Sequence, residues 1–261
     1  MSTEISVPDC IQLERDGDVL VVRLNRPDAL NATNRELHAG LAALWPQIDE
    51  AWDIRAAVIT GNGRAFSAGG DFGYIDDLIN DLDLRRETIV HGRQIVTGMA
   101  KCRVPLVAAV NGPAVGLGCS LVALSDIVFM AESAYLADPH VAIGLVAADG
   151  GPVSWPLLTS LQLAKEYALT GERIPAERAA QIGLVNHVVP DADVFAKAME
   201  CAQKIAKLPR GAVEDTRRVM NLHLEHALLN TLDYAFTAEH RSFDSPELRA
   251  SIDRFQAKRK D

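Results

Sequence analysis

The sequence has little of what marks several common classes of protein. Its 261 residues include only four cysteines, and no two of them form a C-x-x-C motif. Val- and Ala-rich surroundings predict buried thiols in a reducing cytoplasm. Lys and Arg number 26 against 35 Asp and Glu, a net charge of −9. This balance argues against non-specific nucleic-acid binding, which needs a basic face.

Several sequence patterns are absent as well. No apolar run approaches the length that spans a bilayer, so we expect no membrane partner. The first ten residues lack a basic region followed by an apolar one, which argues against a secretory signal and favours a cytoplasmic location. Neither G-x-x-x-x-G-K-[ST] nor G-x-G-x-x-G is present, which argues against the common nucleotide-binding loops. No G-x-S-x-G elbow supports a serine nucleophile.

What the sequence does have is a glycine-rich turn after a short apolar run. Leu106 to Val110 is typical of a strand buried on both faces, and Asn111-Gly112-Pro113 breaks it. Gly116, Gly118 and an apolar run with helix formers follow, which predicts a helix start. Backbone N–H groups at such a turn are unpaired and favour negative charge, either a phosphate or a developing oxyanion. Close packing of a helix on a strand is the alternative explanation.

A second stretch has the same design. Ala57 to Thr60 predicts a buried strand, and Ser67-Ala68-Gly69-Gly70 a glycine turn before a helical segment. Two such turns can aim two N–H groups at one oxygen, as an enolate-like thioester requires.

With these stretches the chain resembles the crotonase (enoyl-CoA hydratase/isomerase) superfamily. The resemblance extends over nearly the whole chain and rests on motifs in the family's order and spacing: Leu24-Asn25-Arg26-Pro27, Ile59-Thr60-Gly61, Phe66-Ser67-Ala68-Gly69-Gly70-Asp71, Val110-Asn111-Gly112, Gly116-Leu117-Gly118-Cys119, Ala168-Leu169-Thr170-Gly171 and Ala179-Ala180-Gln181-Ile182-Gly183. It implies an α/β crotonase fold of repeated ββα units in two roughly perpendicular sheets, surrounded by helices.

The resemblance also implies a domain organisation and partners. We expect residues 1–190 to form the core with the acyl-CoA site, and residues 191–261 to form a helical region that builds homotrimers or dimers of trimers. Coenzyme A would enter as part of the thioester substrate, with no permanently bound cofactor and no metal.

By the same resemblance, the backbone N–H groups of Gly70 and Leu117 form an oxyanion hole. Leu117 stands where the family usually has glycine, so it adds bulk beside the acyl group. Substrate and CoA contacts are expected from Arg26, Ala29, Ala68, Asp71, Phe72 and Gly116. The acidic segment from Ile75 to Leu84 corresponds to a variable segment that covers the acyl pocket, although its charges are more typical of a solvated loop.

The chain departs from the family's hydratases at the two glutamates that activate water. Ser120 and His140 stand at the matching positions, which places hydration by the standard route in doubt. His140 and Asp149 instead suggest an acid/base pair, because histidine exchanges protons near neutral pH and a carboxylate can orient it or act as base. A loop histidine and a turn-capping aspartate are the structural alternatives. We expect Ser120 to line the pocket or to bind a water.

Carbon–carbon bond hydrolases of β-diketones in this family resemble the chain here, with matching histidine and aspartate and a following Trp155-Pro156. The sequence therefore predicts an acyl-CoA-processing enzyme of the enoyl-CoA hydratase/isomerase type. A β-diketone hydrolase, an enoyl- or dienoyl-CoA isomerase, and a non-catalytic acyl-CoA-binding protein remain alternatives.

Three further candidates are weaker. Cys119 follows the glycine turn but is more typical of a buried thiol, and His223 with His226 lacks the H-E-x-x-H spacing of a zinc helix. His91 lies in a predicted helix, 88–100, from which related enzymes use a histidine.

Overall fold

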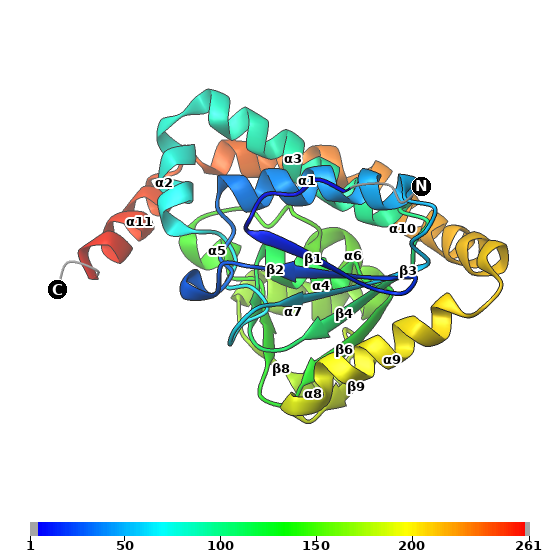
Figure 1. Cartoon of the computed structure of the whole chain (residues 1–261). Coiled ribbons are helices and arrows are strands. Elements are labelled where there is room, and N and C mark those ends of the chain that lie inside the picture. Colours follow the sequence, from blue (N-terminus) through cyan, green and yellow to red (C-terminus); the bar gives the residue numbers. More distant parts are fainter. Residues whose placement is uncertain (1–4, 259–261) are drawn as a thin grey trace.

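A six-stranded sheet forms the centre of the fold in the computed structural model (Figure 1), which describes residues 5–258. The remaining residues, including the first four of the stretch used above to argue against a secretory signal, lie outside the described residues. The first two strands form an antiparallel hairpin, and the others pair in parallel. The strand order is β1 (Ile11–Asp16), β2 (Val19–Leu24), β3 (Ala56–Gly61), β4 (Leu106–Val110), β6 (Ile127–Ala131) and β9 (His187–Val189).

The central strands are buried because their sequences are apolar throughout. Every residue of β3 and β4 is buried, as expected for parallel strands covered on both faces. A small second sheet contains β5 (Ala114–Val115), β7 (Tyr135–Ala137) and β8 (Ile174–Pro175). The consecutive strands β6 and β7 therefore belong to different sheets, β6 to the large one and β7 to the small one. Two separate sheets with surrounding helices confirm the predicted α/β class.

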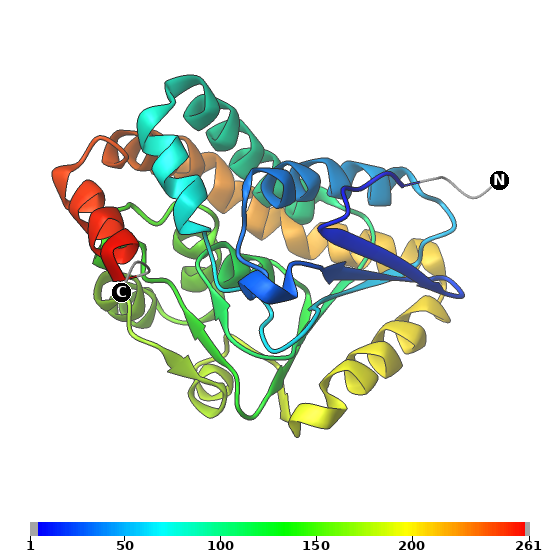
Figure 2. The same ribbon diagram turned by 60° about the vertical axis from the view of Figure 1, so that its left-hand side comes forward.

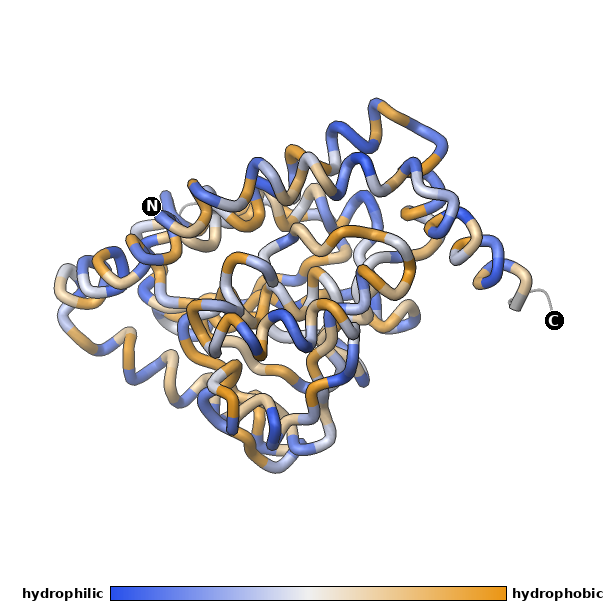
Figure 3. Tube along the Cα trace, turned by 180° about the vertical axis from the view of Figure 1, so that it is seen from behind, coloured by the Kyte–Doolittle hydropathy of each residue, from blue (hydrophilic) through white to orange (hydrophobic). Residues whose placement is uncertain are grey.

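The helices surround the sheets (Figures 1 and 2), and in Figure 3 hydrophilic and hydrophobic residues alternate along the outer ones. In chain order they are η1 (Pro27–Ala29), α1 (Arg35–Glu50), α2 (Phe72–Asn80), α3 (Leu82–Lys101), α4 (Leu117–Ala123), α5 (His140–Ile143), α6 (Gly151–Leu158), α7 (Leu161–Thr170), α8 (Ala176–Gln181), η2 (Asp191–Asp193), α9 (Val194–Ala206), α10 (Arg210–Ser242) and α11 (Pro246–Lys258).

The acidic segment 75–84 is helical, which corrects the expectation of a solvated loop. Most of it belongs to α2, whose Tyr74, Ile75 and Leu78 are buried, whereas Asp77 is exposed and Asp76 forms an ion pair with Arg249. The Asp81 side chain then accepts hydrogen bonds from the N–H groups of Asp83 and Leu84, both at 3.0 Å, and so caps α3. As a result α3 begins at Leu82, earlier than the predicted helix 88–100.

The C-terminal helices pack on the rest of the chain. Helix α9 contacts β3, β4 and β6, and α10 contacts α3 and α6. The buried Arg217 of α10 donates to Asp126 at 2.7 Å and to the Met99 carbonyl at 3.0 Å, which ties α10 to the helices and strands of residues 82–131. The division into a core of residues 1–190 and a C-terminal oligomerisation region stays a prediction.

Helix α11 closes one side of the molecule by packing on α2 and α5. Leu248 and Ile252 of α11 join Tyr74, Ile75, Leu78, Leu145 and Phe243 in a hydrophobic cluster separate from the main core. The Phe255 ring also stacks on Phe72, with 3.9 Å between ring centroids. None of the helices in residues 5–258 is both long and apolar enough to cross a membrane.

Candidate active site

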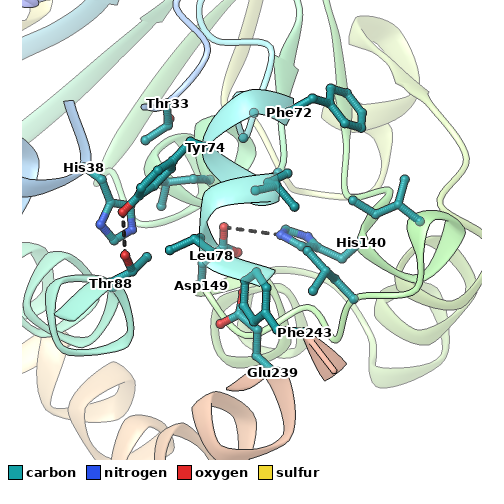
Figure 4. A pocket seen from close by; sticks show the side chains of 18 of the residues that line it. Thr33, His38, Phe72, Tyr74, Leu78, Thr88, His140, Asp149, Glu239 and Phe243 are labelled. Carbon is teal, nitrogen blue, oxygen red and sulfur yellow. Dashed lines mark hydrogen bonds and ion pairs between the residues drawn. The ribbon is translucent and has the colours of Figure 1, made fainter. Parts of the chain in front are cut away.

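A cavity of about 250 Å³ lies where the two glycine turns meet α2, α3, α5 and α10 (Figure 4). Backbone and side chains from both turns line it, together with apolar side chains and a few polar groups. The lining residues include Gly70, Leu117, His140, Asp149, Glu239, His38, Tyr74 and Thr88. The cavity thus brings together residues that are far apart in sequence.

Direct hydrogen bonds hold the two glycine turns side by side. The Ser67 N–H donates to the Pro113 carbonyl at 3.1 Å, and the Val115 N–H donates to the Ser67 carbonyl at 2.9 Å. Gly118 packs so closely on this contact that an added Cβ would lie 2.7 Å from the Ser67 Cβ. A small residue at 118 is therefore required by the approach of one turn to the other.

This contact leaves two backbone donors free at the cavity. Gly70 pairs with Thr33 in a β-bridge whose hydrogen bonds use the neighbouring Gly69 and Asp71. Leu117 is the first residue of α4, where an N–H has no partner within the helix. Neither the Gly70 nor the Leu117 N–H donates a hydrogen bond within residues 5–258, and both residues line the cavity.

The residues expected to contact substrate divide into two groups. Ala68, Phe72 and Gly116 line the cavity, whereas Arg26, Ala29 and Asp71 do not. Arg26 instead forms an ion pair with Asp71 at 3.3 Å, and the Asp71 side chain caps α2 by accepting from the Gly73 N–H at 2.9 Å. Ala29 lies in η1, in the loop that leads to this pair.

His140 lies against the glycine turn that contains Gly116. The Gly116 N–H donates to the Ala137 carbonyl at 2.9 Å, which fixes the end of β7 beside the turn. Gly116 has φ of +53°, which favours glycine, and the His140 ring lies beside it: an added Cβ would be in van der Waals contact with the His140 Cε1, at 3.4 Å. The ring then bonds through Nδ1 to the Asp138 carboxylate, which is 1% exposed.

Asp149 faces the other nitrogen of the same ring. Its Oδ2 lies 3.9 Å from the His140 Nε2, and its Oδ1 accepts a 2.8 Å hydrogen bond from the Ser120 hydroxyl. Gly150 allows this approach, since with φ of +127° its added Cβ would lie 3.3 Å from the Ser120 Cβ. Ser120 is buried and is not among the residues that line the cavity, so it contacts Asp149 rather than the pocket.

Charges around the ring decide its protonation state. Burial alone would lower the pKa of His140, but the negative charges of Asp138 and Asp149 outweigh burial and hold that pKa well above its ordinary value. Burial would raise the pKa of Asp138, yet the His140 charge and hydrogen bond keep it below its usual range. The structure therefore places an imidazolium in the cavity at neutral pH.

The pKa values of Asp149 and Glu239 are raised, in contrast to that of Asp138. Burial raises the pKa of Asp149 against the opposing attraction of His140, and burial raises the pKa of Glu239 to about 8. Glu239 comes from α10 and makes no side-chain hydrogen bond within the described residues. Burial thus favours the protonated, neutral form of Glu239 more than for an ordinary glutamate.

Asp138 and Glu239 were not among the predicted site residues. The Asp-Pro-His sequence offered a signal for Asp138, because a turn at proline can bring two side chains together. Glu239 gave none, since it lies in a charged helix about a hundred residues away in sequence.

The weaker candidates lie elsewhere or are inert. His91 lines a groove between α1 and α3, and its ring centroid is 6.1 Å from that of His38, which does reach the cavity. His223 and His226 are exposed on α10. Burial raises the pKa of the Cys119 thiol, which disfavours the reactive thiolate.

Among the described residues, one group has the spacing of a metal site: Asp138, His140 and Asp149, with ligand atoms within 4.8 Å of one another. The His140 Nδ1 already bonds to Asp138, and the pKa of His140 is raised. A cation would therefore have to displace a strongly held proton from the ring. The group fits proton transfer better than metal binding.

Comparison with known proteins identifies relatives over most of the chain. Residues 14–261 match the family "Enoyl-CoA hydratase/isomerase". A short-chain-enoyl-CoA hydratase from Clostridium acetobutylicum is 30% identical over 249 residues, covering 95% of each chain. The crystal structure of an enoyl-CoA hydratase/isomerase from Mycobacterium paratuberculosis has a TM-score of 0.93 and 60% identity, covering 95% of this chain and 99% of that one. A β-diketone hydrolase from the cyanobacterium Anabaena has a TM-score of 0.84 and 26% identity, covering 90% of this chain and 94% of that one.

The charge arrangement predicts the effect of removing Asp138. In Asp138→Asn the pKa of His140 should fall, because the nearest negative charge and its hydrogen bond to the imidazolium are lost. An NMR titration of the labelled histidine ring measures this pKa directly. Asp233→Asn, an exposed change on α10, serves as the control and should leave it unchanged. An unaltered His140 pKa in Asp138→Asn would contradict the assignment of Asp138 as its main partner.

Proposed function

Because this chain belongs to the enoyl-CoA hydratase/isomerase family, which is a family of enzymes, we propose that it acts on an acyl-CoA thioester through an enolate. One observation carries the proposal: two unpaired backbone N–H groups, at Gly70 and Leu117, line the same cavity as His140 and Asp149. Donors of this kind stabilise negative charge that develops on a carbonyl oxygen. The thioester oxygen would lie between them.

His140 and Asp149 would move the protons. The 3.9 Å between Nε2 and Oδ2 is too long for a direct hydrogen bond, but a single oxygen can contact both atoms. For hydration, Asp149 takes a proton from a water that attacks the β-carbon, and the His140 imidazolium gives a proton to the α-carbon. Ser120 orients Asp149, and Asp138 keeps His140 charged. The sum is addition of one water across the double bond.

Arg26, Ala29 and Asp71 are not among the residues that line the cavity, and the first and last of them form an ion pair. We assign them to the CoA moiety, and Ala68, Phe72 and Gly116 to the acyl end. The Phe72 side chain, at the first turn of α2, marks the boundary.

Hydration of a short trans-2-enoyl-CoA tests the acid/base pair. His140→Ala and Asp149→Asn should each lower kcat by about 10²–10⁴-fold, the usual contribution of a general acid or base. In the wild type, kcat/KM should fall at low pH as Asp149 gains a proton and at high pH as His140 loses one. Because both pKa values are raised, each limb should lie above the ordinary pKa of its residue. Loss of the enoyl-thioester absorbance is the measurement.

His226→Ala, an exposed change on α10, is the matched control and should leave turnover unaltered. Rapid hydration that survives both active-site changes would overturn the assignment of His140 and Asp149. Binding of the ester without turnover of enoyl- or dienoyl-CoA would favour an acyl-CoA-binding protein.

Leu117→Pro offers a clean test of the oxyanion hole. Proline has no N–H yet is well accepted at the first position of a helix, which is the position of Leu117 in α4. We expect kcat to fall by about 10²–10³-fold with the fold retained. Leu117→Ala keeps the N–H and is the matched control. Equal activity of the two variants would exclude the Leu117 N–H from catalysis.

A β-diketone hydrolase is the second candidate. The combination of His140 and Asp149 favours it, because the chain resembles β-diketone hydrolases at these two positions and a β-diketone hydrolase is among the structural relatives. That relative was solved with (S)-3-oxocyclohexyl acetic acid. Cleavage of a free cyclic β-diketone, with no turnover of any CoA ester, would favour this function.

We also propose that the chain forms a trimer or a dimer of trimers. An apolar groove with a volume of about 780 Å³ lies between α6 and α10, and large apolar side chains around it are exposed, including Leu157, Leu158 and Met220. Burial of such a surface against a second copy is favourable.

Met220→Asp should therefore dissociate the oligomer, because it would place a charge in an apolar interface. Sedimentation velocity measures the change in mass. Val90→Asp, on the exposed face of α3 and outside the groove, is the control and should not alter it. A monomeric wild type would contradict the proposal.

A further inference from the structure

The end of the cavity away from His140 is also polar. His38 of α1, Tyr74 of α2 and Thr88 of α3 all line the cavity, and Figure 4 shows them gathered on the side opposite to His140. The proposed chemistry uses none of the three. Most other side chains that line the cavity are apolar, among them Ile75, Leu78, Ile89, Leu145, Phe236 and Phe243.

His38 is a buried side chain without a hydrogen-bond partner. It is 8% exposed, its Nδ1 is fully buried and unpaired, and its Nε2 makes no hydrogen bond within residues 5–258. Burial, with a smaller contribution from His91, lowers the pKa of His38 to about 3, so the ring is neutral throughout the physiological range. We assign the proton to Nε2, since an orphaned buried lone pair is better tolerated than an orphaned buried N–H.

A second hydrogen bond fixes which of the Tyr74 and Thr88 hydroxyls donates to the other. The Thr88 hydroxyl donates to the Leu84 carbonyl at 2.9 Å, so the short contact between the two hydroxyls has Tyr74 as donor and Thr88 as acceptor. The Tyr74 oxygen therefore keeps a free lone pair. The centroids of the His38 and Tyr74 rings are 6.4 Å apart, so a donor-bearing ring and an acceptor-bearing ring line the same end of the cavity.

We propose that the substrate's acyl group carries an oxygen, as a keto or hydroxyl group, at its far end, where the His38 Nε2–H donates to it. A purely hydrocarbon chain would cover His38 and leave its donor unpaired, which costs free energy that an oxygenated chain does not lose. Sites built to hydrogen-bond a substrate oxygen discriminate strongly against analogues that lack it. The inference rests on the proposed function, in that the acyl group is delivered as a CoA ester.

A positional series of saturated esters tests the inference without turnover. The ligands are octanoyl-CoA and its 4-, 5-, 6- and 7-oxo derivatives, and affinity is measured by isothermal titration calorimetry. At least one oxo ester should bind the wild type about tenfold more tightly than octanoyl-CoA. His38→Leu should bring the two affinities within about threefold, because leucine fills the space without a donor.

His38→Gln is the matched variant, because the glutamine amide retains an N–H donor and should restore much of the preference. Tyr74→Phe should leave the preference for a keto group largely intact, because a keto oxygen only accepts. Thermal melting of each variant checks its fold.

Each outcome decides a different claim. Equal binding of all five esters to the wild type would overturn the inference while leaving the proposed function intact, and this comparison needs no variant. A preference that persists in His38→Leu would overturn the role of His38. Failure of every ester to bind would overturn the proposed function, and the oxygenated CoA ester with it.

Discussion

The contact between the two glycine turns is the constraint on which the site depends. Hydrogen bonds between Ser67, Pro113 and Val115 bring the ends of two parallel strands together, and the absence of a side chain at Gly118 permits the approach. From this one contact follow the position of Leu117 at the start of α4, the free N–H of Gly70, and the seat of His140 beside Gly116. The contact between the turns that follow β3 and β4 therefore accompanies the positions of the two free N–H groups, at Gly70 and Leu117.

The three carboxyl groups around His140 differ in how readily they hold a proton. Asp138 forms the close partner of His140 and stays ionised, whereas Asp149 and Glu239 are buried carboxyls that hold protons more readily than usual. The His140 imidazolium thus faces one firmly ionised carboxylate, while burial raises the pKa of the other two carboxyl groups. This division of roles among similar side chains comes from burial and distance, not from residue type.

The sequence was most informative where local chemistry decides the structure. Apolar runs such as Leu106–Val110 predict buried parallel strands, and the glycines that follow predict turns, because no other residue fits those backbone positions. It was least informative where contacts are distant. The acidic residues of α2 obscured a helix whose buried face includes Tyr74 and Leu78. Glu239 and His38 enter the cavity only because α10 and α1 pack beside it, which no local pattern reveals.

The order in which the cavity is built along the chain has a consequence for biosynthesis. The two turns and His140 are present in the first 140 residues, but Phe236, Glu239 and Phe243 complete the wall, and Leu248 and Ile252 of α11 pack behind Tyr74 and Leu78. On the ribosome, a nascent chain that already carries both turns and His140 still lacks this wall. The wall of the cavity is therefore complete only when α10 and α11 have been synthesised, and a chain truncated before them would leave the apolar side chains of Tyr74 and Leu78 uncovered.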